Sequence, residues 1–443
     1  MITAKAFSGK HYAVLGLARS GRATVEALLA SGAKVTAWDD NHNAREDTVD
    51  TVQAASHDWD NCELVIEDFG TADLARFDSI IVTPGLPLNR HPIAARAKAA
   101  GVEIIGDIEL FARARAELPP HKVVGITGTN GKSTTTALVH HILATAGVPS
   151  LMGGNIGLPI LAQDPLPEGG VYVLELSSYQ LDLTESLDSD VAVLLNITPD
   201  HLDRYESFEA YAASKARLFE MQTSGRVGVI AEDDEPTQAI SHELSRNGYW
   251  PKNQLAGVSE FDVTDQAELH NLQGPHNAQN LISALAVCGH LGIPIETAAR
   301  ALSTYPGLPH RMERVAEKNG ALFVNDSKAT NPTATAPALA AFPAIRWILG
   351  GQAKSDSLDE CAAHFGHVRS AYTIGEAAGL FERLLKPHMP VKNCGELAEA
   401  VKQAAADAQA GDTVLLSPAC ASFDQFSDFE ARGDAFRSAV EAL

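Results

Sequence analysis

Cysteine is scarce in this chain of 443 residues, and its spacing excludes two classes of protein. The cysteines are odd in number and scattered, with no C-x-x-C pair. A disulfide framework and a structural zinc site both require clustered cysteines, so neither is expected. A reducing compartment, the cytoplasm, is the expected location. The five residues are Cys62, Cys288, Cys361, Cys394 and Cys420.

Long apolar runs and an excess of positive charge are also missing. No segment approaches the roughly 20 apolar residues that span a bilayer, and no uninterrupted apolar stretch precedes Arg19, so neither membrane insertion nor secretion is expected. Lys and Arg number 34 against 56 Asp and Glu, which gives a net charge of −22. Because such a surface repels phosphate backbones, nucleic acid is not an expected partner. An anionic ligand must therefore be held by local cations and backbone N–H groups.

Three stretches of the chain alternate apolar strands with helical segments, which is typical of parallel α/β domains. Pro119-Pro120 precedes the second stretch, and the Pro- and Gly-rich residues 305–311 form a predicted linker before the third. Ligands of such sheets bind at the carboxyl ends of the strands. The predicted strands are 11–15, 35–38 and 79–82, then 122–127, 171–176 and 191–195, and finally 322–324, 347–349, 372–374 and 414–416.

The strongest motif is TGTNGKST at residues 127–134, between a predicted strand and a predicted helix. Its glycines let backbone N–H groups converge on phosphate oxygens, and the helix N-terminus adds its dipole. Lys132 can reach the β- and γ-phosphates, and the Ser133 hydroxyl can ligate Mg²⁺. The spacing differs from that of a standard P-loop, because Ile126 stands five residues before Gly131. The motif predicts ATP contacts from Gly128, Thr129, Asn130, Gly131, Lys132, Ser133 and Thr134.

Polar residues follow several other predicted strands. Glu175 ends one strand and is a candidate metal ligand, as a carboxylate is in P-loop sheets. The segment 200–204, with His201, fits either a second magnesium shell or a helix start capped by Asp200. Spacing alone places Lys215 on a helix surface. In the last stretch, the strand-end residues Arg311, Asp326, Lys328 and Lys354 can form an anion site.

The first predicted strand leads into a loop that partly matches the dinucleotide fingerprint G-x-G-x-x-G. Gly16 and Gly21 fit, and Asp39 ends the next strand, but Ala18 replaces the middle glycine. A nicotinamide cofactor is therefore not predicted. The loop can still hold the phosphates of another nucleotide through Arg19, Ser20 and Gly21.

Taken in order along nearly the whole chain, the motifs resemble those of the Mur ligases. The phosphate loop GTNGKST also occurs in folylpolyglutamate synthases, whereas GGNIG at 153–157, NDSKATN and SPACAS together are similar to the Mur ligases that add D-glutamate. The remaining matches are LELSSYQL, NITPDHLDR, the H-N-x-x-N of residues 276–280, and LPHR.

This resemblance implies an ATP-dependent ligase that adds D-glutamate to UDP-N-acetylmuramoyl-L-alanine through an acyl phosphate, in cytoplasmic peptidoglycan precursor synthesis. It implies three domains: a Rossmann-like UDP-substrate domain (1–112), a central P-loop-type ATP domain (113–306) and a Rossmann-like D-glutamate domain (307–443). A monomer is expected. The alternatives are a sibling Mur ligase or folylpolyglutamate synthase, and a nucleotide-gated binding protein that hydrolyses ATP slowly without ligation.

The resemblance also implies site residues. Lys132, His201 and Lys215 are the expected catalytic residues, with Lys215 carbamylated by CO₂. The expected ligands of two Mg²⁺ ions are Ser133, Glu175, His201 and Lys215. Outside the phosphate loop, ATP contacts are expected from Asn277, Asn280, Arg311 and Asp326, and D-glutamate contacts from Thr330, Lys354, Ser422 and Phe429. UDP-substrate contacts are expected from Arg19, Ser20, Asp39, Thr83, Gly85 and Asn155. Asn41 departs from the arginine that related enzymes place near the uridine, and Arg45 or Arg19 could substitute.

Overall fold

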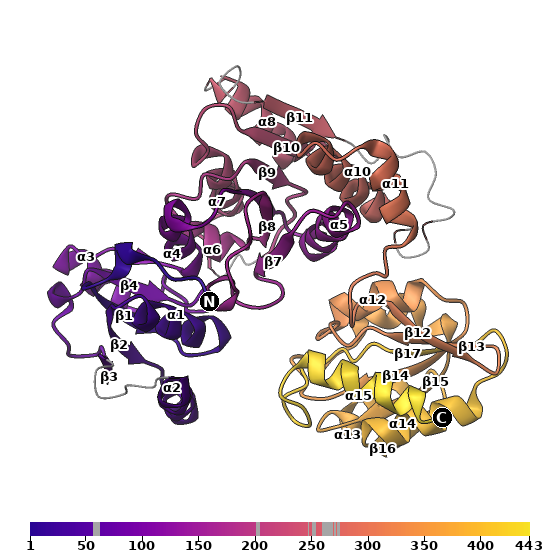
Figure 1. The fold of residues 1–443 in the computed structure, drawn as a ribbon. Coiled ribbons are helices and arrows are strands. Elements are labelled where there is room, and N and C mark those ends of the chain that lie inside the picture. The colour runs from indigo at the N-terminus through magenta and orange to yellow at the C-terminus, as the bar shows by residue number, and fades with distance from the viewer. Residues whose placement is uncertain are drawn as a thin grey trace. The chain divides into compact units, whose positions relative to one another are not determined.

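The structure is a computed structural model that describes residues 1–55, 63–200, 204–246, 248–249, 254–258, 269, 272 and 275–443. The chain divides into two compact units, Met1–Tyr305 and Pro306–Leu443. The first unit holds two sheets and the second unit holds one (Figure 1). Helices connect the strands of each sheet, so the predicted α/β class with three sheet domains is confirmed.

The first sheet has the strand order β3-β2-β1-β4-β5, and every neighbouring pair is parallel. The strand order reverses beside β1, so the carboxyl ends of β1 and β4 border the position where such sheets bind ligands. The strands are β1 (His11–Leu15), β2 (Lys34–Trp38), β3 (Leu64–Ile66), β4 (Ser79–Val82) and β5 (Ile104–Ile105). The helices are α1 (Arg19–Ala30), α2 (His42–Ala55), α3 (Pro92–Ala100) and α4 (Asp107–Ala114).

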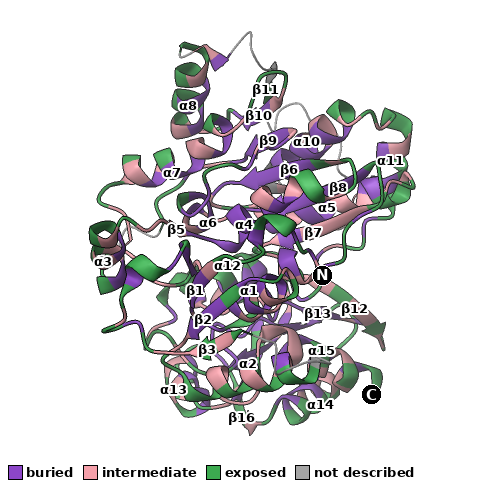
Figure 2. Ribbon diagram, turned by 60° about the vertical axis from the view of Figure 1, so that its left-hand side comes forward, coloured by how far each residue is buried: buried purple, intermediate pink, exposed green. Residues whose placement is uncertain are grey.

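The second sheet is also fully parallel, in the order β11-β10-β9-β6-β8-β7. Its central strands are buried along almost their whole length (Figure 2), as expected for parallel strands with helices on both faces. The strands are β6 (His121–Thr127), β7 (Ser150–Gly154), β8 (Gly170–Glu175), β9 (Val191–Leu194), β10 (Val227–Ala231) and β11 (Gln254–Val258). The helices are α5 (Lys132–Thr145), α6 (Ser178–Asp182), α7 (Phe208–Glu220), α8 (Glu235–Arg246), α10 (Pro275–His290) and α11 (Ile295–Ser303).

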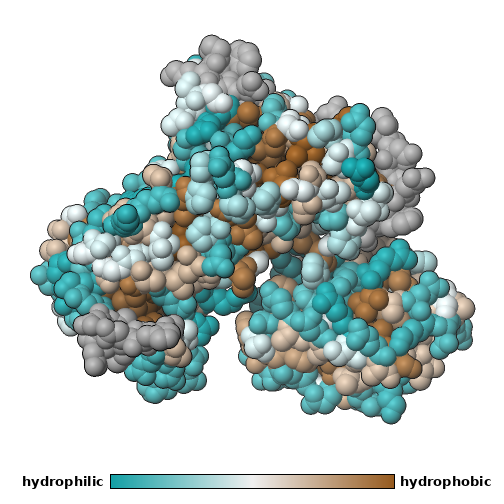
Figure 3. All heavy atoms as spheres, viewed as in Figure 1, coloured by the Kyte–Doolittle hydropathy of each residue, from teal (hydrophilic) through white to brown (hydrophobic). Residues whose placement is uncertain are grey.

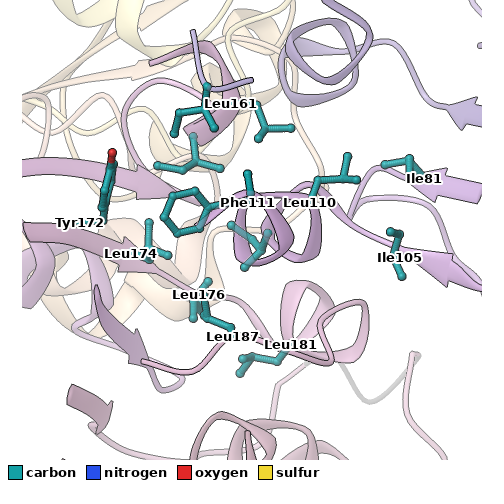
Figure 4. Close-up of a cluster of buried hydrophobic side chains, with 14 of the residues drawn as sticks. Ile81, Ile105, Leu110, Phe111, Leu161, Tyr172, Leu174, Leu176, Leu181 and Leu187 are labelled. Carbon is teal, nitrogen blue, oxygen red and sulfur yellow. The ribbon is translucent and has the colours of Figure 1, made fainter. Parts of the chain in front are cut away.

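Helix α4 joins the cores of these two sheets (Figure 4). Leu110 and Phe111 on this helix are fully buried in one hydrophobic cluster that contains Ile81 of β4 and Tyr172 of β8. The ring centroids of Phe111 and Tyr172 lie 5.1 Å apart in an edge-to-face arrangement, which stabilises the contact beyond its buried area. One continuous core therefore underlies both sheets of the first unit.

The second unit contains a six-stranded sheet in the order β12-β13-β17-β14-β15-β16, in which only β12 and β13 are antiparallel. Helices cover both faces, so each face has its own hydrophobic cluster. The strands are β12 (Glu313–Lys318), β13 (Ala321–Asn325), β14 (Ile345–Gly350), β15 (Val368–Ile374), β16 (Val391–Gly395) and β17 (Thr413–Leu416). The helices are α12 (Pro332–Ala340), α13 (Ala378–Leu385), α14 (Leu397–Asp407) and α15 (Phe429–Glu441), with a 3₁₀ segment at Asp359–His367.

Hydrophilic side chains cover much of the visible face of both units, with small hydrophobic areas between them (Figure 3). Within the described ranges, no helix combines the length and the apolar character that a membrane crossing requires.

Candidate functional site

The phosphate loop, residues 128–134, connects β6 to α5 at the centre of the second sheet. Gly131 has a φ of 83°, and a Cβ there would lie 2.1 Å from Asn280 Oδ1, so only glycine fits. Asn280 in α10 also accepts a hydrogen bond from the Thr135 hydroxyl (3.2 Å) and donates one to Asn277 Oδ1 (3.2 Å). The structure thus places Asn280 against the phosphate loop and Asn277 beside Asn280.

Asn196, just after β9, shapes the phosphate loop from its other side. Its backbone carbonyl accepts a hydrogen bond from Thr129 N–H, and its side-chain oxygen accepts one from Asn130 N–H, both at 2.8 Å. Its amide nitrogen donates to Gln279 Oε1 in α10 at 2.7 Å. Asn196 lies in one of the motifs of the sequence, but no role was predicted for it or for Gln279, because nothing in the local pattern predicts these distant partners.

Lys132 begins α5, and its ammonium group lies over the phosphate loop. The Nζ atom donates to the carbonyl oxygens of Gly128 (2.9 Å) and Thr129 (2.8 Å). Phosphate oxygens are charged acceptors and form stronger hydrogen bonds with an ammonium group than neutral carbonyls do. The geometry therefore suits a lysine that exchanges loop carbonyls for nucleotide phosphates.

Glu175 is a buried carboxylate at the carboxyl end of β8, with 2% of its surface exposed. Its Oε1 atom accepts a hydrogen bond from Asn155 Nδ2 at 3.0 Å, whereas Oε2 has no hydrogen-bond partner in the described part of the chain. A buried carboxylate oxygen without a donor is costly unless a cation or a ligand satisfies it. Glu175 therefore fits a metal ligand, and Asn155, predicted for the UDP substrate, lies beside it.

Not all of the predicted magnesium ligands lie within the described residues. His201 lies outside the described residues, and no cluster of three His, Cys, Asp or Glu side chains within them has metal-binding geometry. Helix α7 is capped by Ser207, whose hydroxyl accepts a hydrogen bond from Ala210 N–H at 3.2 Å. The alternative of a helix start capped by Asp200 falls on residues 201–203, which lie outside the described residues.

Lys215 in α7 is buried, with 1% of its surface exposed, which corrects the surface position expected from spacing alone. Its Nζ atom donates to the Gly128 carbonyl at 2.9 Å and lies 4.5 Å from the centre of the Tyr211 ring. Burial, followed by the positive charge of Lys132, lowers the pKa of Lys215 to about 7. A large share of Lys215 is therefore a neutral amine near neutral pH.

Five of the six residues predicted to contact the UDP substrate gather near the carboxyl ends of β1, β2 and β4, whereas Asn155 follows β7 in the second sheet. Asp39 connects two of these ends, since its carboxylate accepts hydrogen bonds from the N–H groups of Leu17 (2.7 Å) and Asn41 (2.8 Å). Arg19, at the start of α1, donates to the Gly157 carbonyl at 3.1 Å. Thr83 packs against the first glycine loop, where a Cβ on Gly16 would lie 2.3 Å from its hydroxyl oxygen. Of the remaining predicted contacts, Ser20 lies in the first turn of α1, and Gly85 lies in the loop after β4.

In the second unit, the residues predicted to contact D-glutamate lie in segments that follow the neighbouring strands β13, β17 and β14. The loop after β14, with the exposed Lys354, pairs with the loop after β17 through two Gln352–Ala421 backbone hydrogen bonds of 2.9 and 3.0 Å. Thr330 follows β13, Ser422 is buried, and Phe429 begins α15. The structure therefore places four residues beyond the carboxyl ends of these parallel strands: Thr330, Lys354, Ser422 and Phe429.

Arg432 in α15 joins the loops that follow β13 and β17. No role was predicted for it from the sequence. Only 1% of its surface is exposed, and its guanidinium donates to the carbonyl of Ser327 at 2.9 Å and to the carbonyl of Cys420 at 3.1 Å. Burial lowers its pKa to about 10. Because α15 is an amphipathic helix, an arginine on it is expected at the surface from the sequence alone.

Asp326, predicted for the nucleotide site, is a buried carboxyl group in the second unit. Its oxygens accept hydrogen bonds from the Ser417 hydroxyl (2.8 Å) and from Met312 N–H (3.2 Å). Burial raises its pKa to about 7, against the smaller opposing effects of these hydrogen bonds and of Arg311. The Met312 contact holds the segment that carries Arg311 close to β13.

These features define a multidomain α/β protein with a phosphate-binding loop, a buried carboxylate and a buried lysine beside it. Comparison with known sequences is consistent with this class. Residues 10–106 match the Mur ligase MurD-like N-terminal domain, residues 126–288 the Mur ligase middle domain, and residues 310–420 the Mur ligase glutamate ligase domain.

Close relatives match over the full chain. The chain is 60% identical over 446 residues to the UDP-N-acetylmuramoylalanine--D-glutamate ligase of Novosphingobium aromaticivorans, covering 100% of this chain and 97% of the relative. It is 57% identical over 450 residues to the ligase of the same name from Zymomonas mobilis, covering 100% of both. The chain belongs to the Mur ligase family, as the motifs predicted.

Solved structures agree on the fold. UDP-N-acetylmuramate-alanine ligase MurC from Thermotoga maritima has a TM-score of 0.58 at 15% identity, covering 98% of this chain and 99% of that one. MurF ligase from the same organism, in complex with ADP, also has a TM-score of 0.58, at 17% identity, covering 98% and 96%. At these identities the likeness concerns the fold alone.

Proposed function

We propose that this chain ligates D-glutamate to UDP-N-acetylmuramoyl-L-alanine at the expense of ATP, releasing ADP and phosphate during synthesis of peptidoglycan precursors. The observation that carries the proposal is the full-length identity of 57–60% to D-glutamate ligases, together with the phosphate loop and the strand-end cations described above. The same observation favours this reaction over that of a sibling ligase or a folylpolyglutamate synthase.

Amide formation from a carboxylate is unfavourable in water, so the carboxylate must first become an acyl phosphate. The L-alanyl carboxylate attacks the γ-phosphorus of ATP, and ADP leaves. This step brings two anions together, and two unit charges 4 Å apart repel by ~4 kcal/mol at an effective dielectric near 20. Lys132 and the N–H groups of the phosphate loop offset this repulsion and stabilise the charge on the phosphoryl group in transfer.

The amine of D-glutamate then attacks the acyl carbon, and phosphate leaves. The amine must arrive without its extra proton, and His201 or a water molecule accepts that proton. Thr330, Lys354, Ser422 and Phe429 are proposed to hold D-glutamate, with the Lys354 ammonium paired to a carboxylate. Arg311, Asp326, Asn277 and Asn280 are proposed to contact the nucleotide.

Two Mg²⁺ ions are proposed to be held by Ser133, Glu175, His201 and a carbamate on Lys215. Magnesium neutralises phosphate charge, and it is usually bound by one or two carboxylates with substrate phosphates. Glu175 Oε2 has no hydrogen-bond partner among the described residues, which supports the place of Glu175 in this set. The lowered pKa of Lys215 supports the carbamate, because only a neutral amine attacks CO₂ to form the N–C bond with loss of a proton.

For the UDP part, the proposed contacts are Arg19, Ser20, Asp39, Thr83, Gly85 and Asn155. Arg45 is proposed to take the place of the arginine missing at Asn41. Its guanidinium carbon lies 4.3 Å from the centre of the Trp38 ring, and it donates to the Asp39 and Asp40 carbonyls. A cytoplasmic location is proposed, which the free thiols of the four described cysteines support, and a monomer is proposed as the state of assembly.

A substrate panel tests the proposed reaction directly. The purified chain with ATP, Mg²⁺, UDP-N-acetylmuramoyl-L-alanine and D-glutamate is expected to release phosphate and to yield a conjugate heavier by one glutamyl residue in mass spectrometry. L-glutamate and a folate acceptor serve as controls. Product from folate with L-glutamate would support the folate-type ligase, and phosphate release without any acceptor amine would support a simple ATPase.

Replacement of Lys354 by alanine tests the amino-acid site. Loss of one charge-assisted hydrogen bond to D-glutamate is expected to raise the KM for D-glutamate about tenfold or more, with the KM for ATP changed less than about twofold. Steady-state phosphate release measures both constants. Lys386→Ala, which removes an exposed lysine paired to Glu382 in the same unit, is the matched control. Equal effects of Lys354→Ala on both substrates would remove it from the amino-acid site.

A further inference from the structure

Arg204, just before α7, contacts the loop that follows β4 in the first sheet. Its guanidinium donates to the carbonyl oxygens of Leu86 (2.8 Å), Gly85 (3.3 Å) and Pro84 (3.5 Å). These carbonyls belong to the 83–86 loop, which carries Thr83 and Gly85 of the proposed UDP-substrate site. A side chain of the second sheet domain therefore fixes three successive peptide groups of the first.

Aromatic side chains hold the Arg204 guanidinium in place. Its Cζ atom lies 4.1 Å from the centre of the Tyr179 ring in α6, and that ring stacks on Tyr205, with centroids 6.2 Å apart and planes inclined by 15°. The Tyr205 hydroxyl donates to Asp182 at 2.7 Å. Only arginine combines a planar face for stacking with several N–H donors in one plane.

The same aromatic group extends to the phosphate loop. Tyr205 packs against Tyr211 in α7, with ring centroids 5.4 Å apart. The Tyr211 hydroxyl forms a hydrogen bond of 3.0 Å with the Thr129 hydroxyl. Arg204 is thus anchored on the elements that form the ATP site, while its donors are directed at the 83–86 loop.

The other face of the 83–86 loop is open. Gly85 is exposed, and a Cβ added there would meet no atom of the described residues within 4 Å. The C=O and N–H groups on either side of a trans peptide bond point in opposite directions, so the Pro84 carbonyl that faces Arg204 directs the Gly85 N–H away from it. A backbone N–H at an open loop, with a guanidinium behind it, suits a phosphate group.

We propose that Arg204 is a positioning residue for the UDP substrate, which holds the 83–86 loop in the conformation that presents the Gly85 N–H to the diphosphate. The inference rests on the proposed function, because it takes this loop as part of the UDP-substrate site. Its charge also adds a fixed cation near an anionic ligand in a protein with a net charge of −22.

Binding measurements on the full chain test this proposal. Arg204→Ala is expected to weaken binding of UDP-N-acetylmuramoyl-L-alanine about tenfold in calorimetry, while the affinity for the ATP analogue AMP-PNP changes less than about twofold. Arg204→Lys keeps the positive charge but loses the planar set of N–H donors. This variant is expected to weaken substrate binding by an intermediate factor of about three. Should the alanine variant fail to fold, the lysine variant decides the matter through the same two affinities.

Arg96→Ala is the matched control, because the Arg96 guanidinium also donates to two loop carbonyls, Phe69 and Ala72, but wholly within the first sheet domain. It is expected to leave both affinities unchanged. Substrate binding by the Arg204 variants equal to wild type, an equal loss for both ligands, or an Arg96→Ala effect as large as that of Arg204→Ala would overturn the inference. If the wild-type chain forms no product in the substrate panel, the proposed function itself fails, which is a separate result.

Discussion

Replacing Lys132 by alanine is expected to abolish ATP-dependent ligation, with kcat reduced by about 1,000-fold or more. The ammonium group lies over the phosphate loop and is the cation available to offset the approach of a carboxylate to the γ-phosphate. Its ammonium group donates to the carbonyls of Gly128 and Thr129, which belong to a loop and not to a strand or helix, so the fold should remain intact. Phosphate release with the complete substrate set measures the loss, and circular dichroism with thermal unfolding measures the fold.

Lys122→Ala is the control for this experiment. Lys122 is an exposed lysine at the other end of β6, so its removal changes the net charge equally but leaves the phosphate loop unaltered. Normal turnover is expected. Retained turnover in the Lys132 variant would refute the assignment of the phosphate loop.

Replacing Lys215 by alanine is expected to leave little activity, and short-chain carboxylic acids such as acetate are expected to restore part of it. The substitution removes the proposed carbamate and opens space beside the Gly128 carbonyl and the Tyr211 ring. A small carboxylate bound there can supply the missing anionic oxygens. Initial rates with increasing acetate measure the rescue. Lys132→Ala serves as the negative control, because an added anion cannot replace an ammonium group.

The same residue predicts a pH dependence. With a pKa lowered to about 7, Lys215 is mainly an ammonium group below pH 7 and mainly a neutral amine above it. Carbamylation needs the neutral amine, so wild-type activity at limiting bicarbonate should fall as the pH decreases through 7, and added bicarbonate should offset the fall. The activity of the acetate-rescued Lys215→Ala variant should not show this fall with decreasing pH. Full activity of Lys215→Ala without any added acid would exclude the carbamate.

The sequence was sufficient to predict most of the buried parallel strands, but not β10 (Val227–Ala231), which is buried at four of its five residues. The predicted strand 11–15 is β1, and the predicted strand 122–127 lies within β6, because strands buried on both faces are continuous apolar runs. Strands at the sheet edges were not predicted. The segment Ser150–Gly154 forms β7, and the charged Glu313–Lys318 forms β12, and neither has more than partial burial along most of its length. Edge strands gain much of their stability from backbone hydrogen bonds with one neighbouring strand. Because few of their side chains are buried, their sequences have only a weak hydrophobic pattern.

The candidate site was predictable only where a motif is local. The phosphate loop, with its glycine at a positive φ, could be recognised within eight residues. The contacts of Asn196 with Gln279, and of Arg432 with Ser327 and Cys420, join residues far apart in the chain. Hydrophobic periodicity contains no information on such partners. Burial of Lys215 follows from the packing of α7 on the phosphate loop, so its lowered pKa could not be predicted from spacing.

The shared core around α4 has a consequence for catalysis. To separate the first two sheets, the rings of Phe111 and Tyr172 would have to enter water, at a cost of several kcal/mol in lost burial. The phosphate loop and the loops proposed to bind the UDP part are therefore aligned when the chain folds. ATP and the UDP substrate therefore lose little orientational entropy beyond the entropy that each loses on binding. The orientational freedom that must still be removed before reaction belongs mainly to the incoming amino acid.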